Sequence, residues 1–102
     1  MKNNIPIGSR VSLDKDALDL PYIKFRKHYT NMYEGKTGTV IGKTADSSKL
    51  AIQFDDIVFY KHNEKLSSHD TGCHGKGKLH YCWYIPYEMV NLIDDKNLLL
   101  LL

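Results

Sequence analysis

A chain of 102 residues is long enough for one hydrophobic core and too short for two independent ones. Its hydrophobic fraction of 42% and charged fraction of 25% are those of a globular protein and argue against a disordered tail or a membrane protein. The formal net charge of +2 is too small to indicate a nucleic-acid binder by itself. We therefore expect a single domain that folds alone.

We expect neither an export signal at the start of the sequence nor a membrane-spanning segment at its end. Residues 1–7 contain one lysine, two asparagines and one proline without a long apolar core, so they do not have the form of a secretory signal. We expect a cytoplasmic location, where Cys73 and Cys82 would be thiols or metal ligands rather than a disulfide. Residues 97–102 form a leucine tail far shorter than the roughly 20 apolar residues that cross a bilayer. This tail is expected to pack on the domain or fray, or alternatively to form an oligomer contact.

The first predicted element is a strand over residues 7–13. Val11 and Leu13 alternate there with Arg10 and Ser12. A period of two is typical of a strand with one buried face.

The next predicted element is a short helical insertion at about residues 20–34. Pro21 suits the first turn of a helix. Polar residues separate apolar side chains at helical spacing. The apolar positions are Tyr22, Phe25, Tyr29 and Met32.

A hairpin is predicted from residues 35–54. Residues 35–43 combine β-branched side chains with regularly spaced glycines, which is typical of a strand that bends sharply. A polar turn at 45–48 precedes a strand with Leu50, Ile52 and Phe54 on one face. Residues 57–60 are a candidate extension of the same sheet.

The remaining third of the chain is predicted to contain a long loop and two strands. Residues 61–78 are rich in glycine, lysine and histidine, and we expect one loop there. Residues 79–85 are aromatic and β-prone, with Tyr81, Trp83 and Ile85 expected on one face. A tight turn at residues 86–89 and a last short strand at 90–93 complete the chain.

These elements predict a mainly β fold, namely a small barrel of five short strands with one helical insertion. The run 83–93 (aromatic strand, proline, one 3-10 turn and a strand that begins with valine) resembles the end of Src-homology-3 (SH3) domains. Residues 8–11, 35–43 and 50–55 are similar to the first strands of SH3-like barrels, including KOW-type and Mind-bomb/HERC-type modules. Four further features together resemble small uncharacterised phage-encoded proteins: Gly-Lys-Thr-Gly-Thr-Val at 35–40, Gln-Phe-Asp-Asp at 53–56, the His-Asp- and glycine-rich loop, and Cys-Trp-Tyr at 82–84. The first long loop lacks the Ala-Leu-Tyr-Asp-Tyr motif of SH3 domains, so binding of proline-rich peptides is not implied.

Catalytic and metal-binding patterns are weak in this sequence. The only neighbouring histidine and carboxylate, His69 and Asp70, stand side by side in the predicted loop, where they cannot easily face one another. We therefore expect no enzymatic activity and no cofactor. Soft-metal ligands cluster without the spacing of a standard zinc finger, so a structural zinc is an alternative to an ordinary loop with a half-buried cysteine. The candidate ligands are His69, Cys73, His74, His80 and Cys82.

Rings and cations give the most informative pattern. Both nucleic acids and acidic protein surfaces bind to such combinations. The alternative is that residues such as Trp83 belong to the core and that the lysines are merely solvated. The candidate binding residues are Lys24, Arg26, Lys27, His28, Lys36, Tyr60, Lys61, Trp83, Tyr84 and Tyr87.

Two functions follow from this pattern. The first is a non-catalytic protein-binding module. The resemblance to phage-encoded proteins implies that a phage encodes it and that it acts in the host cytoplasm, where it binds and modulates a host or viral protein. The second is a KOW-like nucleic-acid-binding protein whose affinity would fall steeply with salt. Its phosphate contacts would be Lys24, Arg26, Lys27, Lys36 and Lys43.

Overall fold

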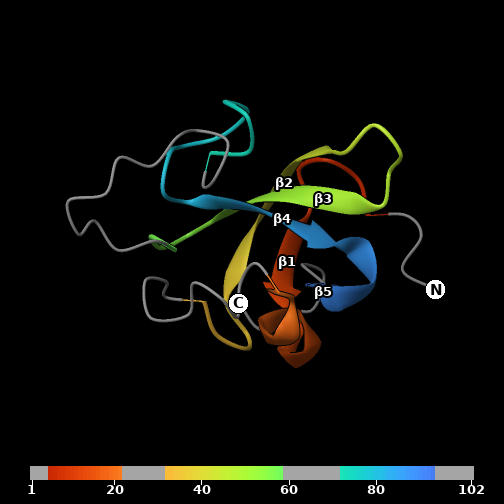
Figure 1. Cartoon of the computed structure of the whole chain (residues 1–102), viewed down its shortest axis with the longest axis vertical. Helices are drawn as coiled ribbons and strands as arrows, with labels where there is room; N and C mark the ends of the chain where they lie inside the picture. The colour runs from red at the N-terminus through yellow and green to blue at the C-terminus, as the bar shows by residue number, and fades with distance from the viewer. Residues whose placement is uncertain (1–4, 22–31, 59–71, 94–102) are drawn as a thin grey trace, which may run out of the picture.

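The computed structural model describes residues 5–21, 32–58 and 72–93. Five short β-strands dominate these residues, with two 3-10 helices between them (Figure 1). The elements are β1 (Arg10–Leu13), η1 (Lys15–Asp19), β2 (Thr37–Lys43), β3 (Lys49–Phe54), β4 (Cys82–Pro86), η3 (Tyr87–Met89) and β5 (Val90–Leu92). The prediction of a mainly β fold is confirmed, and so is the turn between the last two strands.

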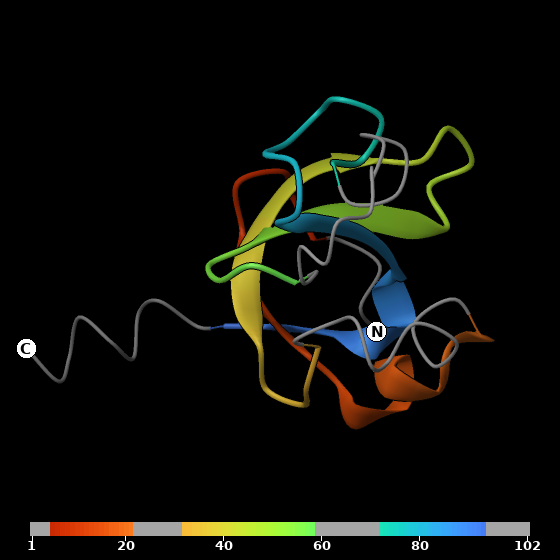
Figure 2. The ribbon, with the colours of Figure 1, turned by 60° about the vertical axis from the view of Figure 1, so that its left-hand side comes forward.

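The five strands form one antiparallel sheet in the order β4-β3-β2-β1-β5. Strands β1 to β4 pair with their neighbours in sequence, whereas β5 returns to β1 and places Leu13 opposite Val90. Figure 2 shows β2 curving strongly as it passes from β3 to β1. A register shift between Val40 and Gly42 interrupts the β2–β3 ladder. Such a bulge increases local bend and twist, as the regularly spaced glycines predict.

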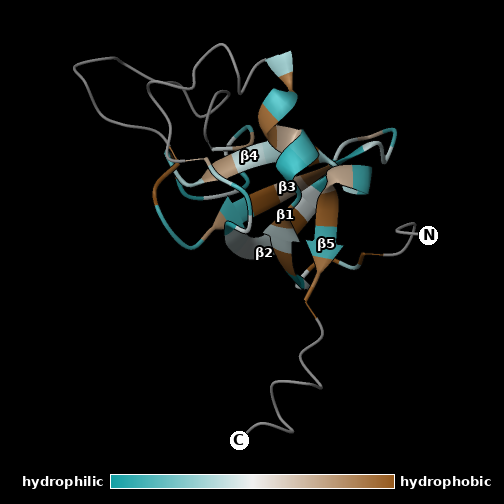
Figure 3. Ribbon diagram, turned by 90° about the horizontal axis from the view of Figure 1, so that it is seen from below, coloured by the Kyte–Doolittle hydropathy of each residue, from teal (hydrophilic) through white to brown (hydrophobic). Residues whose placement is uncertain are grey.

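The main core lies between the buried faces of all five strands. In Figure 3 the brown, hydrophobic segments of β1, β3 and β5 lie close together. Alternation produces this core directly, because every second residue of β1 and β2 is buried. The buried members are Ile5, Val11, Leu13, Ala17, Val40, Leu50, Ile52, Phe54, Val58, Trp83, Ile85 and Val90.

A second, smaller cluster covers the opposite face of β3 and β4. Ala51, Cys73 and Cys82 form its buried centre. Tyr81 packs against this cluster, so the prediction that Tyr81 shares a face with Trp83 and Ile85 is wrong. The reason is that β4 begins only at Cys82, whereas the Tyr81 N–H donates to the Lys78 carbonyl in a turn (3.0 Å).

Several predicted segments lie partly or wholly outside the described residues. They include most of the helical insertion (22–31), the end of the candidate strand extension (59–60), the first part of the long loop (61–71) and the leucine tail (97–102). The described end of that loop, residues 72–78, is a series of turns. Residues 57 and 58 are not in a strand, although Val58 is buried in the core. Within the described ranges, no helix is long and apolar enough to span a bilayer.

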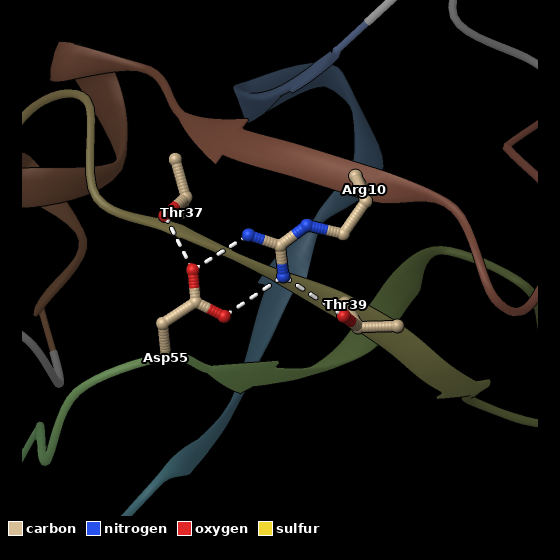
Figure 4. A network of polar contacts seen from close by, with 4 residues as sticks. All are labelled: Arg10, Thr37, Thr39 and Asp55. Atoms are coloured by element: carbon tan, nitrogen blue, oxygen red, sulfur yellow. Dashed lines mark hydrogen bonds and ion pairs between the residues drawn. The ribbon is translucent and has the colours of Figure 1, made fainter. Parts of the chain in front are cut away.

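An ion pair ties β1 to the end of β3 across β2 (Figure 4). The Arg10 guanidinium donates to both carboxylate oxygens of Asp55, at 2.8 and 2.6 Å, and to Oγ1 of Thr39 at 3.0 Å. Thr37 donates its hydroxyl to Asp55 at 2.6 Å. The hydrogen bonds from Arg10, which have the largest effect, and the bond from Thr37 lower the pKa of Asp55 to about 2. Asp55 is thereby held as a carboxylate.

We expect Asp55→Asn to reduce the free energy of unfolding near neutral pH by about 1 kcal/mol, since partial exposure of the pair to solvent screens its charges. The folded-state pKa lies below the unfolded-state value of about 3.9, so the stabilisation is complete above that value and is lost as pH falls through about 2. Urea denaturation at several pH values measures this effect. The exposed Asp19, changed to Asn, is the control, and a difference that persists undiminished at pH about 2 would contradict the assignment.

A candidate binding pocket beside the β2–β3 turn

A pocket of about 330 Å³ lies where the β2–β3 turn meets loop 72–78 and β4. Figure 2 shows that this turn and the teal loop lie at the same end of the molecule. Three lysines line the pocket, and no carboxylate of the described residues does. The lining residues are Lys43, Thr44, Ala45, Lys49, His74, Lys76 and Tyr84.

The β2–β3 turn is held by the carboxylate of Asp46. Its Oδ1 accepts hydrogen bonds from the Thr44 hydroxyl (2.8 Å) and from the backbone N–H and hydroxyl of Ser48 (3.0 and 2.7 Å). These bonds lower the pKa of Asp46 to about 2, and the bond from the Ser48 N–H has the largest effect. Asp46 therefore organises the turn, and the lysines at the adjoining strand ends, Lys43 and Lys49, face the pocket.

Loop 72–78 has an unusual backbone. Cys73, His74 and Gly75 have successive positive φ values of 50°, 57° and 85°. The left-handed conformation costs a non-glycine residue about 1–2 kcal/mol. Backbone hydrogen bonds from the N–H groups of Gly75 and Gly77 to the Gly72 carbonyl, both 3.1 Å, close the turn. Such strain persists only where surrounding contacts enforce it.

Contacts with β3 and β4 hold loop 72–78 in this strained conformation. The Cys73 side chain is 1% exposed and packs with Cys82. Gln53 Oε1 accepts a hydrogen bond from the Lys78 backbone N–H (3.0 Å). Gly77 lies so near that a Cβ there would overlap Sγ of Cys82. The loop is thus fixed on the sheet, with His74 and Lys76 on the pocket side.

The hydroxyl of Tyr84 is the polar centre of the pocket. The Lys76 ammonium donates to it at 3.1 Å, and Nδ1 of His74 lies at the same distance. The Lys76 stem crosses β2 at Gly42, where a Cβ would lie 3.1 Å from its Cδ. Glycine at this position therefore lets the stem lie close to the strand. The result is a lysine whose charge is directed toward Tyr84.

The two cysteines are free thiols in contact with one another. The Cys73 thiol donates to Cys82, which raises the pKa of Cys73 together with burial and lowers that of Cys82. Among the described residues, no three histidine, cysteine or acidic side chains gather around a common point. His80 does not join the cysteines in such a group, and His69 lies outside the described residues. A zinc site completed by His69 stays a prediction.

Of the predicted binding residues that the structure describes, Lys36, Trp83 and Tyr87 do not line the pocket. Lys36 is only 2% exposed, with its ammonium 4.4 Å from the centre of the Tyr33 ring, and burial lowers its pKa against the opposing effect of nearby aspartates. Trp83 is 5% exposed and Tyr87 packs against the core, so the reading of Trp83 as a core residue describes the structure. Tyr84 alone of the described candidates lines the pocket. Outside the described residues lie Lys24, Arg26, Lys27, His28, Tyr60 and Lys61.

Sequence reasoning missed Lys49 and Lys76 and named Lys43 only for nucleic-acid binding. The hairpin contained a usable signal, because Lys43 and Lys49 stand at the paired ends of β2 and β3 around a short turn. No comparable signal marks Lys76, whose place depends on the left-handed loop.

The described polar side chains of the pocket are ammonium ions, hydroxyls and an imidazole, a set that can donate hydrogen bonds to an anion. Comparisons of the chain with protein-family models, with curated proteins and with solved structures find no match in any of the three. Function is therefore inferred from the geometry of the pocket.

Proposed function

We propose that this chain is a non-catalytic binding module, built as a small SH3-like barrel, that binds an acidic segment of a protein partner in its basic pocket. The observation that carries the proposal is the convergence of Lys43, Lys49 and Lys76 on one pocket, which within the described part of the chain is lined by no carboxylate. Complementary charge of this kind gives a binding site its specificity and speeds association.

Support for the barrel comes from the sheet. The last strand, β5, returns to pair with the first, and β2 is bent by a bulge. The 3-10 helix η3 joins β4 to β5 where the resemblance to SH3 domains places such a turn. A small rigid sheet that presents its turns and loops on one end is well suited to recognition.

Support for a binding role comes from the size and preorganisation of the pocket. A volume of about 330 Å³ is near the lower end for ligand pockets and suits one or two side chains of a partner. The resemblance to small phage-encoded proteins makes a host or viral protein, modulated in the host cytoplasm, the partner that we propose.

The proposal predicts charge-dependent binding of acidic peptides. We expect a fluorescently labelled peptide rich in glutamate and aspartate to bind, and the matched peptide of glutamine and asparagine not to bind. Lys43→Gln should weaken binding about tenfold, the effect of losing one favourable charge at a partly hydrated site. Fluorescence anisotropy measures both affinities.

Lys15→Gln is the matched control, since Lys15 is an exposed lysine on η1 that does not line the pocket. It should leave the affinity unchanged. Equal binding of the acidic and the neutral peptide, or equal effects of the two lysine variants, would contradict the proposal.

Nucleic-acid binding is the second candidate, because Lys43 of the predicted phosphate contacts does line the pocket. The same assay with single- and double-stranded oligonucleotides tests it. Binding that falls steeply as salt rises would favour this candidate, since counterion release drives such complexes.

A further inference from the structure

The pocket carries more positive charge than one carboxylate neutralises. Lys43 and Lys76 bring two ammonium groups to it, and Lys49 lines the same pocket. The carboxylate of the β2–β3 turn, Asp46, already accepts three hydrogen bonds through Oδ1 within the turn and does not line the pocket. A phosphate monoester carries a charge of about −1.5 to −2 at neutral pH, which matches this surplus better than a single carboxylate does.

The donors also approach the pocket from separate segments. Lys43 ends β2, Lys49 begins β3 and Lys76 belongs to loop 72–78. A phosphate monoester presents three terminal oxygens in a tetrahedral arrangement, whereas a carboxylate presents two in a plane. Donors that reach one pocket from separate segments therefore fit the phosphate group better.

The most strongly positioned of these donors is Lys76. Its stem lies against Gly42, and its ammonium donates one of three N–H groups to the Tyr84 hydroxyl at 3.1 Å. That hydroxyl in turn lies 3.4 Å from the Cys73 carbonyl, to which it donates. The strained, buried turn at Cys73 thus holds the Tyr84 hydroxyl, which in turn positions the Lys76 ammonium above the sheet. A donor fixed before binding loses less conformational entropy when a ligand arrives.

We infer that the pocket recognises a phosphate monoester, carried on a phosphorylated side chain of the protein partner. This inference rests on the proposed function, because it names the acidic group that the pocket takes. The described lysines outside the pocket favour a protein source over a nucleic acid. Lys36 is buried, Lys78 holds its ammonium over the Tyr81 ring (4.3 Å) and Lys15 lies on η1, so they do not extend the pocket into a stripe that follows a phosphate backbone.

The test compares three peptides that differ at one position, which is phosphoserine, glutamate or serine, in an otherwise acidic sequence. Calorimetry should show the phosphoserine peptide binding about tenfold more tightly than the glutamate peptide. In two-dimensional NMR spectra the phosphopeptide should shift the backbone amide signals of Gly42 and Lys76. Lys76→Gln should abolish most of the preference for phosphoserine, and Tyr84→Phe should reduce it, whereas Lys15→Gln should leave it intact.

The outcomes separate this inference from the function on which it rests. Equal affinity for the phosphoserine and glutamate peptides would overturn the phosphate assignment and leave an acidic-segment binder standing. Failure of every acidic peptide to bind would overturn both. A 5′-phosphorylated oligonucleotide that binds more tightly than the phosphopeptide would overturn the protein source. Circular dichroism of each variant verifies that the domain remains folded.

Discussion

Trp83→Ala is expected to lower the free energy of unfolding by about 3–5 kcal/mol, the cost of removing a large aromatic side chain from a packed core. Trp83 is 5% exposed and belongs to the main core, together with Ile85 on the same face of β4. For a domain of this size, such a loss lowers the melting temperature by more than about 10 °C. Because Trp83 is the only tryptophan, far-ultraviolet circular dichroism rather than intrinsic fluorescence should follow the transition.

The adjacent residue supplies the control. Tyr84 points to the other face of the strand and lines the pocket, so Tyr84→Phe should cost no more than about 1 kcal/mol, the net value of a typical hydrogen bond. The pair distinguishes a core ring from a ligand-binding ring. Normal stability of Trp83→Ala, with lost binding instead, would show that Trp83 serves a partner and not the core.

Gly38→Ala is expected to destabilise the domain by about 3 kcal/mol or more, because the added methyl group overlaps backbone atoms that cannot move alone. A Cβ at Gly38 would lie 2.7 Å from the Gln53 carbonyl oxygen and 2.9 Å from Cα of Phe54. Both atoms belong to the backbone of β3, which pairs with β2. The two strands would therefore have to separate to relieve the overlap. Urea denaturation measures the loss.

Gly42→Ala is the matched control in the same strand. There the nearest atom is Cδ of Lys76, 3.1 Å away on a flexible side chain that can shift. We expect a stability change within about 1 kcal/mol, since alanine also reduces the entropy of the unfolded chain. Equal losses for Gly38→Ala and Gly42→Ala would show that the β2–β3 contact is not as close as described.

Local patterns predicted the sheet because the residues that face the main core alternate along the strands. Val11 and Leu13 in β1 and the alternating residues of β3 identify the core face without reference to the rest of the chain. Tyr81 was misplaced because alternation was extended past the start of β4 into a turn, and a turn has no period of two. The sequence pattern does not show where regular pairing stops.

The pocket could be predicted only in part, because it depends on contacts between distant segments. The two lysines at the ends of the hairpin follow from its register. The position of Lys76 follows from three left-handed residues in a row, and the sequence offers only Gly75 as a sign of that conformation. Cys73 and His74 adopt it because burial of the cysteine side chain outweighs local preference.

Strand β3 lies between the two hydrophobic clusters, one on each face. It is hydrogen-bonded along both of its edges, to β2 and to β4. Amide hydrogens at Ala51 and Ile52 should therefore exchange with deuterium among the slowest in the described sheet, since their exposure requires opening on two faces and two edges at once. The pocket's supports, Gln53 and the loop packed on Ala51, are attached to this strand. The groups that would contact a ligand should therefore unfold locally no more often than β3 does. A partner would then bind to a site that seldom unfolds locally.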